Sequence, residues 1–371
     1  MAPVIIYITG FHQHAGKTVA ALGIISSLKK IMDPSRIGFF KPVGQQMVSL
    51  ASGHRIDKDA QIVDTFSGIP NIDIEYTSPV RLTSGFTRKY LDSPNPEEVT
   101  RKLRMEISKT LEIMATKDII IAEGTGHPGV GSIVGLSNAK VSNLMKAEII
   151  FLSAGGIGKA LDQLEVNISY FLYKKSRVRG IIFNKLLPDK IPIVKRYITE
   201  DLLNRKLAAV GGPLRILGFL PLIEDISNPS MHLISRNWEN GETLGDPDTE
   251  AWKTPCKEIK VLTQPSENLR RRNFLNPGDL IIISCASQTR SRSILKYNKK
   301  LKEHSRGLGG IILAGGNYVT LDSQIKKDIA AAALPALYVP EHMATCEQKL
   351  LKIYESTKLQ VYDYNKIEEI E

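Results

Sequence analysis

The chain has 371 residues, 42% hydrophobic and 24% charged, which indicates a globular protein with enough core for two domains. Its net charge of +10 comes from scattered basic residues, apart from Arg270-Arg271-Arg272 and the Lys296–Lys302 region, and few aromatic residues accompany them, which argues against a nucleic-acid partner. Three distant cysteines exclude a disulfide framework and a zinc site, and no signal peptide or membrane-length apolar run is visible, so we expect a cytoplasmic protein without a membrane partner.

The first eighteen residues predict a phosphate-binding loop. Val4 to Ile8 form an unbroken apolar run, typical of a buried central strand, which ends at Gly10. Gly16-Lys17-Thr18 follows and opens a helical pattern that continues to Lys30. A strand, a glycine-bounded loop, Gly-Lys-Thr and a helix in this order are the signature of a P-loop, here one residue longer than the usual spacing.

In such a loop the backbone N–H groups face a phosphate, and the helix dipole adds partial positive charge. Lys17 would reach the β- and γ-phosphates, and the Thr18 hydroxyl would bind Mg²⁺. The residues of this segment expected to bind the nucleotide are Gly10, His14, Ala15, Gly16, Lys17, Thr18 and Val19.

The next segment supplies a lysine and an acid. Arg36 to Phe40 predicts a strand, and Lys41 at its carboxyl end would point into the ligand crevice of an open α/β sheet, unless it is a surface lysine before a turn. Asp57-Lys58-Asp59-Ala60 opens a predicted helix that ends at Phe66. Asp59 either caps this helix or approaches Mg²⁺, directly or through water.

Residues 70–96 are rich in Pro, Ser and Thr and predict a long loop. Thr87, Arg88 and Lys89 place a hydroxyl and two cations on it, which is typical of a lid over a phosphate site; a solvated connector is the alternative. Thr87 and Arg88 are therefore candidate contacts on the substrate side.

Glu123 ends the next predicted strand. Four apolar residues, 119–122, would place it beside the phosphate loop, where an acid usually partners Mg²⁺; an incidental acid in a glycine-rich turn is the alternative. The glycines that follow let the backbone approach a ligand, so we expect Gly124, Thr125 and Gly126 on the substrate side.

Three more strands are predicted, at 148–153, 179–185 and 215–221. In the second of these, the Asn184 amide could hydrogen-bond a purine edge while the stem of Lys185 packs on the base. Strands that alternate with helices predict an α/β fold with a doubly wound parallel sheet over residues 1–230.

A smaller α/β domain is predicted over residues 231–371. Residues 231–257 are polar, hold both tryptophans, and form either a linker or the irregular opening of this domain. Alternation of strands and helices resumes at Ile259, with strands predicted at 279–284, 310–316 and 335–340.

Residues 1–230 resemble the dethiobiotin synthetase-like P-loop ATPases. The matching segments are Gly10–Thr18, Lys41-Pro42-Val43, Lys58-Asp59-Ala60, Glu123-Gly124, Asn184 and Gly218–Pro221. More closely, Gly85–Asp92 and Glu123–Ser132 resemble the N-terminal domain of long phosphate acetyltransferases, and residues from about 231 resemble the DRTGG domain that follows it there. The acetyltransferase catalytic domain lies outside the resemblance.

The resemblance implies ATP and Mg²⁺ as cofactors. Asp59 and Glu123 would complete the Mg²⁺ site begun by Thr18. In dethiobiotin synthetase the equivalent of Lys41 faces the carboxylated substrate, so Lys41 and Lys17 are the candidate catalytic residues. The nucleotide contacts implied beyond the loop are Asn184, which would bind adenine, Lys185 and Pro221.

Two functions remain open. One is a nucleotide-sensing regulatory module that reports ATP occupancy to a protein partner. The other is an ATP-dependent ligase or kinase-like enzyme that phosphorylates a small anionic acceptor of the carboxylate type. No residue stands out as a general base, so the sequence leaves open whether the chain is an enzyme. We expect a homo-oligomer in either case.

Overall fold

The computed structural model describes residues 2–50, 52–70, 72–207, 212–263, 274–317 and 319–370. The chain forms two compact units, Met1–Leu222 with Ile367–Glu371, and Ile223–Lys366. The basic run Arg270-Arg271-Arg272 lies outside the described residues. Within the described ranges, every helix is too short or too polar to cross a membrane.

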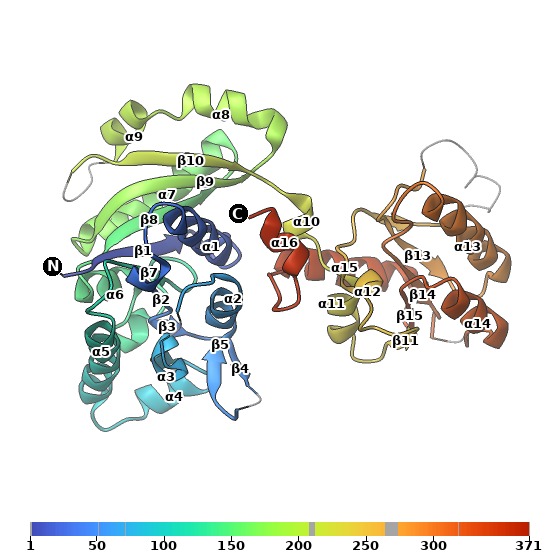
Figure 1. The fold of residues 1–371 in the computed structure, drawn as a ribbon, viewed down its shortest axis with the longest axis horizontal. Helices are drawn as coiled ribbons and strands as arrows, with labels where there is room; N and C mark the ends of the chain where they lie inside the picture. The colour runs from blue at the N-terminus through green and yellow to red at the C-terminus, as the bar shows by residue number, and fades with distance from the viewer. Residues whose placement is uncertain are drawn as a thin grey trace. The chain divides into compact units, whose positions relative to one another are not determined.

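The first unit is built on a six-stranded parallel sheet with the order β10-β9-β8-β1-β7-β2 (Figure 1). Its strands are β1 (Val4–Gly10), β2 (Ile37–Phe40), β7 (Ile119–Glu123), β8 (Glu148–Ala154), β9 (Arg177–Leu186) and β10 (Arg215–Pro221). The apolar β1 lies between β7 and β8, and Ile8 pairs with Glu123. The carboxyl ends of β1 and β7 therefore meet at one edge of the sheet.

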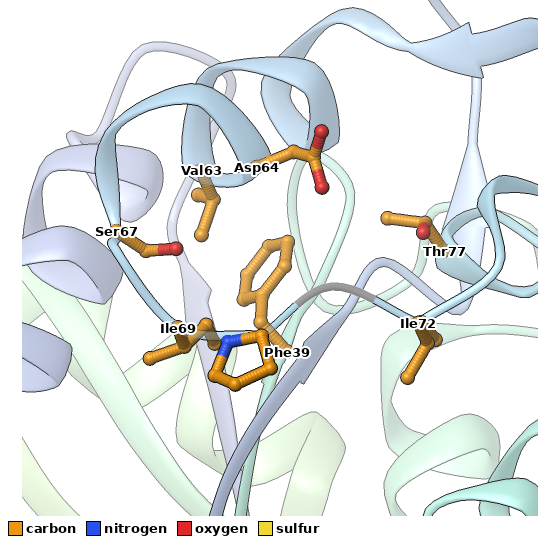
Figure 2. Close-up of a pocket in the computed structure, with 8 residues that line it drawn as sticks. Phe39, Val63, Asp64, Ser67, Ile69, Ile72 and Thr77 are labelled. Carbon is orange, nitrogen blue, oxygen red and sulfur yellow. The ribbon is translucent and has the colours of Figure 1, made fainter. Parts of the chain in front are cut away.

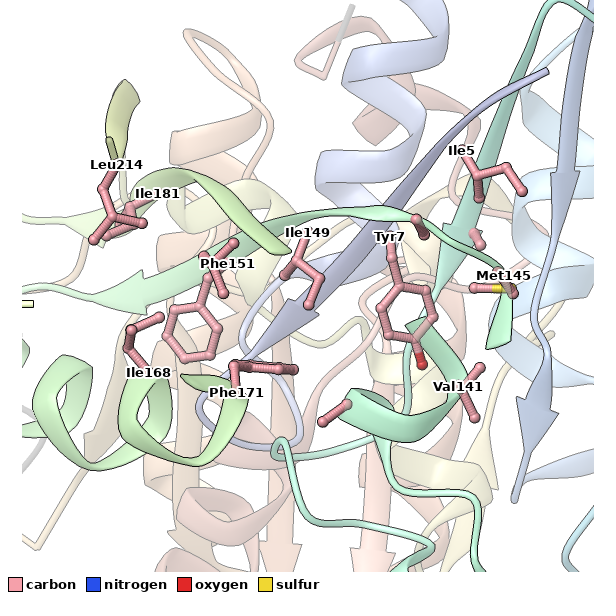
Figure 3. Packing of buried hydrophobic residues seen from close by; sticks show 14 of the residues in the cluster. Ile5, Tyr7, Val141, Met145, Ile149, Phe151, Ile168, Phe171, Ile181 and Leu214 are labelled. Atoms are coloured by element: carbon pink, nitrogen blue, oxygen red, sulfur yellow. The ribbon is translucent and has the colours of Figure 1, made fainter. Parts of the chain in front are cut away.

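Helices cover both faces of this sheet (Figure 1). One face packs against α1, and the other, which carries Ile5 and Tyr7, is covered by α5, α6 and α7. Figure 3 shows this second face, where Phe151 of β8 meets Phe171 of α7 edge to face, with ring centroids 6.2 Å apart. These layers confirm the predicted α/β fold with a parallel central sheet.

The first unit also contains helices and short strands that connect or cover the strands of the sheet. They are α1 (Lys17–Lys29), η1 (Pro34–Arg36), β3 (Val43–Gly44), β4 (Met47–Ser49), β5 (Arg55–Asp57), α2 (Lys58–Phe66), α3 (Ile74–Thr77), β6 (Val80–Arg81), α4 (Phe86–Leu91), α5 (Pro96–Ile113), η2 (Ser132–Val134), α6 (Asn138–Leu144), α7 (Ile157–Tyr173), η3 (Pro188–Lys190), α8 (Ile191–Tyr197) and α9 (Glu200–Lys206).

The segment 70–96, predicted as a long loop, contains regular structure, namely α3, β6 and α4. Asp73 caps α3 by accepting a hydrogen bond from the Glu75 N–H at 3.3 Å. The hydroxyl of Tyr90 on α4 is hydrogen-bonded to that of Thr100 on α5 at 2.9 Å. The prediction of one continuous loop was wrong, because composition does not reveal local caps and side-chain hydrogen bonds such as these.

The second unit is built on a five-stranded sheet with the order β11-β15-β14-β13-β12, parallel except for β11. Trp238 and Trp252, only 4% and 3% exposed, pack against this sheet, so residues 231–257 are folded rather than a free linker. The elements from β10 to the end are α10 (Glu224–Ser227), α11 (Met231–Arg236), β11 (Glu242–Leu244), α12 (Glu250–Lys253), β12 (Ile259–Val261), β13 (Leu280–Ser284), α13 (Gln288–Lys302), β14 (Gly310–Ala314), α14 (Ser323–Ala331), β15 (Ala336–Val339), α15 (Met343–Ser356) and α16 (Tyr364–Glu368). The three cysteines, Cys256, Cys285 and Cys346, are free thiols and buried.

Candidate nucleotide-binding site

The loop between β1 and α1 depends on glycine at both ends. Gly16 precedes the first turn of α1 with φ +89°, a left-handed conformation that a residue with a side chain rarely adopts. A Cβ at Gly16 would also collide with the Asn184 amide, and a Cβ at Gly10 would lie 2.9 Å from the Cβ of Ala15. His14 has φ +62° as well, so the loop takes a compact, tightly turned path.

The two P-loop side chains are both in contact with groups of the site. The Lys17 ammonium donates a hydrogen bond to the His12 carbonyl at 3.0 Å, and the residue is 7% exposed. The Thr18 hydroxyl donates to Oε1 of Glu123 at 3.2 Å. The structure therefore brings the helix start and the carboxyl end of β7 together, as the pairing of β1 with β7 requires.

Lys41 is buried in a ring of carboxylates. Its Nζ lies 3.1 Å from Asp57 Oδ1 and 3.5 Å from Glu123 Oε1, and it also forms an ion pair with Asp59. Lys41 is 3% exposed, so the alternative of a surface lysine is wrong. Three carboxylates face this one ammonium. Lys17 is a second cation that acts on Glu123.

Burial and charge act in opposite directions on this cluster. Burial raises the pKa of Glu123 to about 7, although the Lys41 ammonium lowers it. Burial alone would lower the pKa of Lys41, but the carboxylates, Glu123 first, raise it above its ordinary value. Lys41 is therefore charged at neutral pH, whereas Glu123 titrates near neutrality.

Asp57, and not Asp59, caps α2. Its Oδ1 accepts the Asp59 N–H at 3.0 Å, and its Oδ2 accepts the N–H groups of Gln45 and Gln46 at 3.0 and 3.1 Å. Asp59 lies in the first turn of α2, with its carboxylate on Lys41. The capping role of Asp57 was not predicted from the sequence, although an acid just before the first helical residue is the usual cap signal.

The oxygen atoms gathered here fit Mg²⁺. Thr18, Asp59 and Glu123 offer a hydroxyl and carboxylates, and Oε2 of Glu123 is buried with no hydrogen-bond partner among the described residues. Across the described ranges, no set of three or more His, Cys, Asp or Glu forms a metal cage of its own. Mg²⁺ usually takes one or two protein carboxylates and completes its shell with water and substrate phosphates.

The predicted base-binding residues lie at the carboxyl ends of β9 and β10. The Asn184 amide donates to the Ala15 carbonyl at 2.9 Å, so in this structure it supports the phosphate loop. Lys185 is exposed with φ +56°, and Pro221, also exposed, pairs with Leu186. A contact of these residues with adenine stays a prediction.

The predicted substrate-side residues divide into two groups. Thr125 is 6% exposed and donates its hydroxyl to the Val43 carbonyl, so the loop after Glu123 is tied to the segment that follows Lys41. Thr87 and Arg88 are exposed on α4, which lies against α5 and η2. Within the described residues, no hydrogen bond or ion pair joins Thr87 or Arg88 to the phosphate loop.

A small cavity lies between β2, α2 and the 69–77 segment (Figure 2). Its volume of about 10 Å³ is room for about one water molecule. None of the predicted site residues lines it, so it is not the acceptor pocket. Its lining residues are Phe39, Val63, Asp64, Ser67, Ile69, Pro70, Ile72 and Thr77.

Comparison with known proteins gives one family and several solved structures. The family described as AAA domain matches residues 5–230. The signal recognition particle receptor FtsY from Elizabethkingia anophelis in complex with GDP is 13% identical, with a TM-score of 0.30, and the match covers 50% of this chain and 49% of the receptor. This chain thus spans about half the length of that receptor. A plasmid partition protein from Borrelia burgdorferi B31 bound to AMPPNP is 15% identical, with a TM-score of 0.35, and the match covers 61% of this chain and 90% of that one.

Proposed function

We propose that this chain, which belongs to the AAA domain family of P-loop NTPases, binds Mg²⁺-ATP as a nucleotide-sensing regulatory module. In this proposal the loop N–H groups and Lys17 bind the phosphates, while Thr18, Asp59 and Glu123 hold the metal. The bound Mg²⁺ would neutralise phosphate charge. Asn184 would keep the loop in shape beneath the nucleotide.

The single observation that carries a sensing role is the position of Lys41. An enzyme that phosphorylates a carboxylate acceptor needs a cation directed at that acceptor. Here the Lys41 ammonium is 3% exposed and surrounded by Asp57, Asp59 and Glu123. Its charge is already balanced inside the protein, so it supports the site rather than an incoming substrate.

We also propose which kinds of domain make up the two parts of the chain. The motifs that resemble the N-terminal domain of long phosphate acetyltransferases favour a dethiobiotin synthetase-like first domain and a DRTGG-like second one. In this reading residues 1–230 bind the nucleotide, and residues 231–371 report its presence to a protein partner. We propose a cytoplasmic homo-oligomer.

An ATP-dependent ligase or kinase-like enzyme is the second candidate. The observation that favours it is the exposed group of Thr87, Arg88 and Lys89 on α4. An arginine fork suits bidentate capture of a carboxylate or phosphate. This candidate requires α4 to contribute to an acceptor site.

Thermal unfolding and nucleotide turnover together test the proposal. At a hundredfold excess over Kd, Mg²⁺-ATP should stabilise the wild type by about 2.7 kcal/mol, a rise in Tm of about 5–10 °C. Lys17→Ala should abolish this shift, whereas Lys102→Ala, at a side chain 70% exposed on α5, should keep it. The same titrations with Mg²⁺-GTP compare the two nucleotides.

Turnover separates the two candidates. A sensor should hydrolyse ATP far more slowly than about 1 s⁻¹, the lower end of typical kinase rates. Turnover above that rate, stimulated by a carboxylate acceptor and lost in Arg88→Ala, would favour the enzyme. An equal thermal shift in the wild type and in Lys17→Ala would reject the nucleotide site itself.

A further inference from the structure

One buried asparagine at the start of α6 holds the loop that follows Glu123. Asn138 is 3% exposed. Its Oδ1 accepts hydrogen bonds from the Tyr7 hydroxyl at 2.6 Å and from the Thr125 N–H at 3.1 Å. Its Nδ2 donates to the carbonyls of Thr125 at 2.8 Å and His127 at 2.7 Å. All the hydrogen-bonding capacity of this side chain is therefore used.

The partners leave only one orientation for this amide. A backbone N–H can only donate, so Thr125 N must meet Oδ1 of Asn138, and the two carbonyls can only accept, so they must meet Nδ2. Burial raises the pKa of Tyr7, which keeps its hydroxyl protonated as the fourth partner. Asn138 and its hydrogen bonds, called the Asn138 clamp below, thus join the central strand β1, the helix α6 and the loop at residues 125–127.

This clamp lies directly over the residue after Glu123. A Cβ at Gly124 would come within 2.7 Å of Asn138 Oδ1 and 2.9 Å of the Tyr7 hydroxyl, so the Tyr7–Asn138 pair needs glycine there. On the other side, Thr125 donates its hydroxyl to the Val43 carbonyl. The loop therefore connects the segment that carries Glu123 to the segment that carries Lys41.

We propose that Asn138, supported by Tyr7, is a positioning residue of the Mg²⁺-nucleotide site. It keeps the 124–127 loop fixed, so that Glu123 stays beside Thr18 and the carboxylates stay grouped around Lys41. The inference rests on the proposed function, since it concerns how the same site holds its metal. Groups that hydrogen-bond a metal ligand directly typically contribute 10–100-fold to metal affinity; Asn138 acts on Glu123 through the residues that follow it, and the lower end of that range is the expected effect.

The test compares Asn138 with a second asparagine that hydrogen-bonds backbone groups elsewhere in the same unit. Asn204 donates to the carbonyls of Glu200 at 2.7 Å and Leu214 at 3.0 Å and accepts the Leu214 N–H at 2.8 Å. Asn204→Ala is therefore a matched control for the loss of an asparagine side chain that hydrogen-bonds backbone groups. Tyr7→Phe removes one hydrogen bond without a cavity of side-chain size, and keeps the test valid if Asn138→Ala does not fold.

ATP affinity is measured by calorimetry with Mg²⁺ and with EDTA, and amide hydrogen exchange of residues 125–127 is measured without metal or nucleotide. Asn138→Ala should lose at least tenfold in the Mg²⁺-dependent affinity, with the affinity in EDTA changed by less than twofold, and exchange at 125–127 should become faster. Tyr7→Phe should change in the same direction by less. Asn204→Ala should keep the wild-type Mg²⁺ dependence.

Equal Mg²⁺ dependence in Asn138→Ala, Tyr7→Phe and Asn204→Ala, with binding by the wild type intact, would overturn the inference and leave the proposed function standing. So would a parallel loss of affinity with Mg²⁺ and with EDTA, because that result would mark a purely structural clamp. A wild type that does not bind Mg²⁺-ATP at all would overturn both proposals.

Discussion

Replacement of Lys41 by methionine tests whether a buried cation balances the three carboxylates. Methionine keeps an unbranched side chain that is one atom shorter, and it removes the charge. At an effective dielectric constant near 20, each unit-charge pair at 3.1–3.5 Å contributes about 5 kcal/mol of attraction, much of it offset by desolvation. Removing one partner from a buried cluster leaves uncompensated charge and typically costs about 3–5 kcal/mol. For a unit of this size that is a fall in Tm of about 6–20 °C.

Urea unfolding of wild type, Lys41→Met and Lys102→Met measures this cost. Lys102 pairs with Glu98 at 3.8 Å on the surface of α5, and its loss should change stability by less than about 1 kcal/mol. Because protonated carboxyl groups need no cation, the deficit of Lys41→Met should shrink as the pH falls from 7.5 to 5. Asp59→Asn in the Lys41→Met background should recover part of the loss. A Lys41→Met protein within about 1 kcal/mol of wild type at pH 7.5 would refute the reasoning.

Two further predictions concern single residues of the site. Gly16→Ala should weaken Mg²⁺-ATP binding at least tenfold in calorimetry, because φ +89° and the Asn184 amide both oppose a Cβ. Gly53→Ala, at φ +82° in open space, should leave binding unchanged. Equal effects of the two substitutions would contradict the role given to the contact between Gly16 and Asn184. The metal-free protein should lose stability as the pH rises from about 4.5 to about 7, because folded Glu123 keeps a proton that the unfolded chain has released, and Glu123→Gln should abolish that slope in urea titrations.

The parts of the site that the sequence predicted are those with strong local signals. The apolar run before Gly10 and the Gly16-Lys17-Thr18 start of α1 are read within eighteen residues. Glu123 was predicted from the four apolar residues before it, and the pairing of β1 with β7 places it beside Thr18. The predicted alternation of strands and helices likewise depends on short apolar segments, because an apolar run by itself indicates a buried strand.

The contacts of Asn184 and Lys41 could not be predicted in the same way. Both lie at the carboxyl edge of a strand, as the sequence indicated, but strand position does not say which way a polar side chain turns. Asn184 is 169 residues from the Ala15 carbonyl that it binds, and Lys41 is 82 residues from Glu123. Such pairings depend on the finished packing of the sheet.

The residues that reasoning from sequence missed, Asp57 and Asn138, share a physical character. Each is almost fully buried and forms hydrogen bonds with backbone groups of a neighbouring loop. Burying a polar side chain costs free energy unless all its hydrogen bonds are formed. A buried side chain whose hydrogen bonds to a loop are complete therefore favours one conformation of that loop. Asp57 fixes residues 45 and 46 after Lys41, and Asn138 fixes residues 125–127 after Glu123. Lys41 and Glu123 are thus each followed by a segment that another buried residue holds, which is the arrangement expected of a site that binds with little rearrangement.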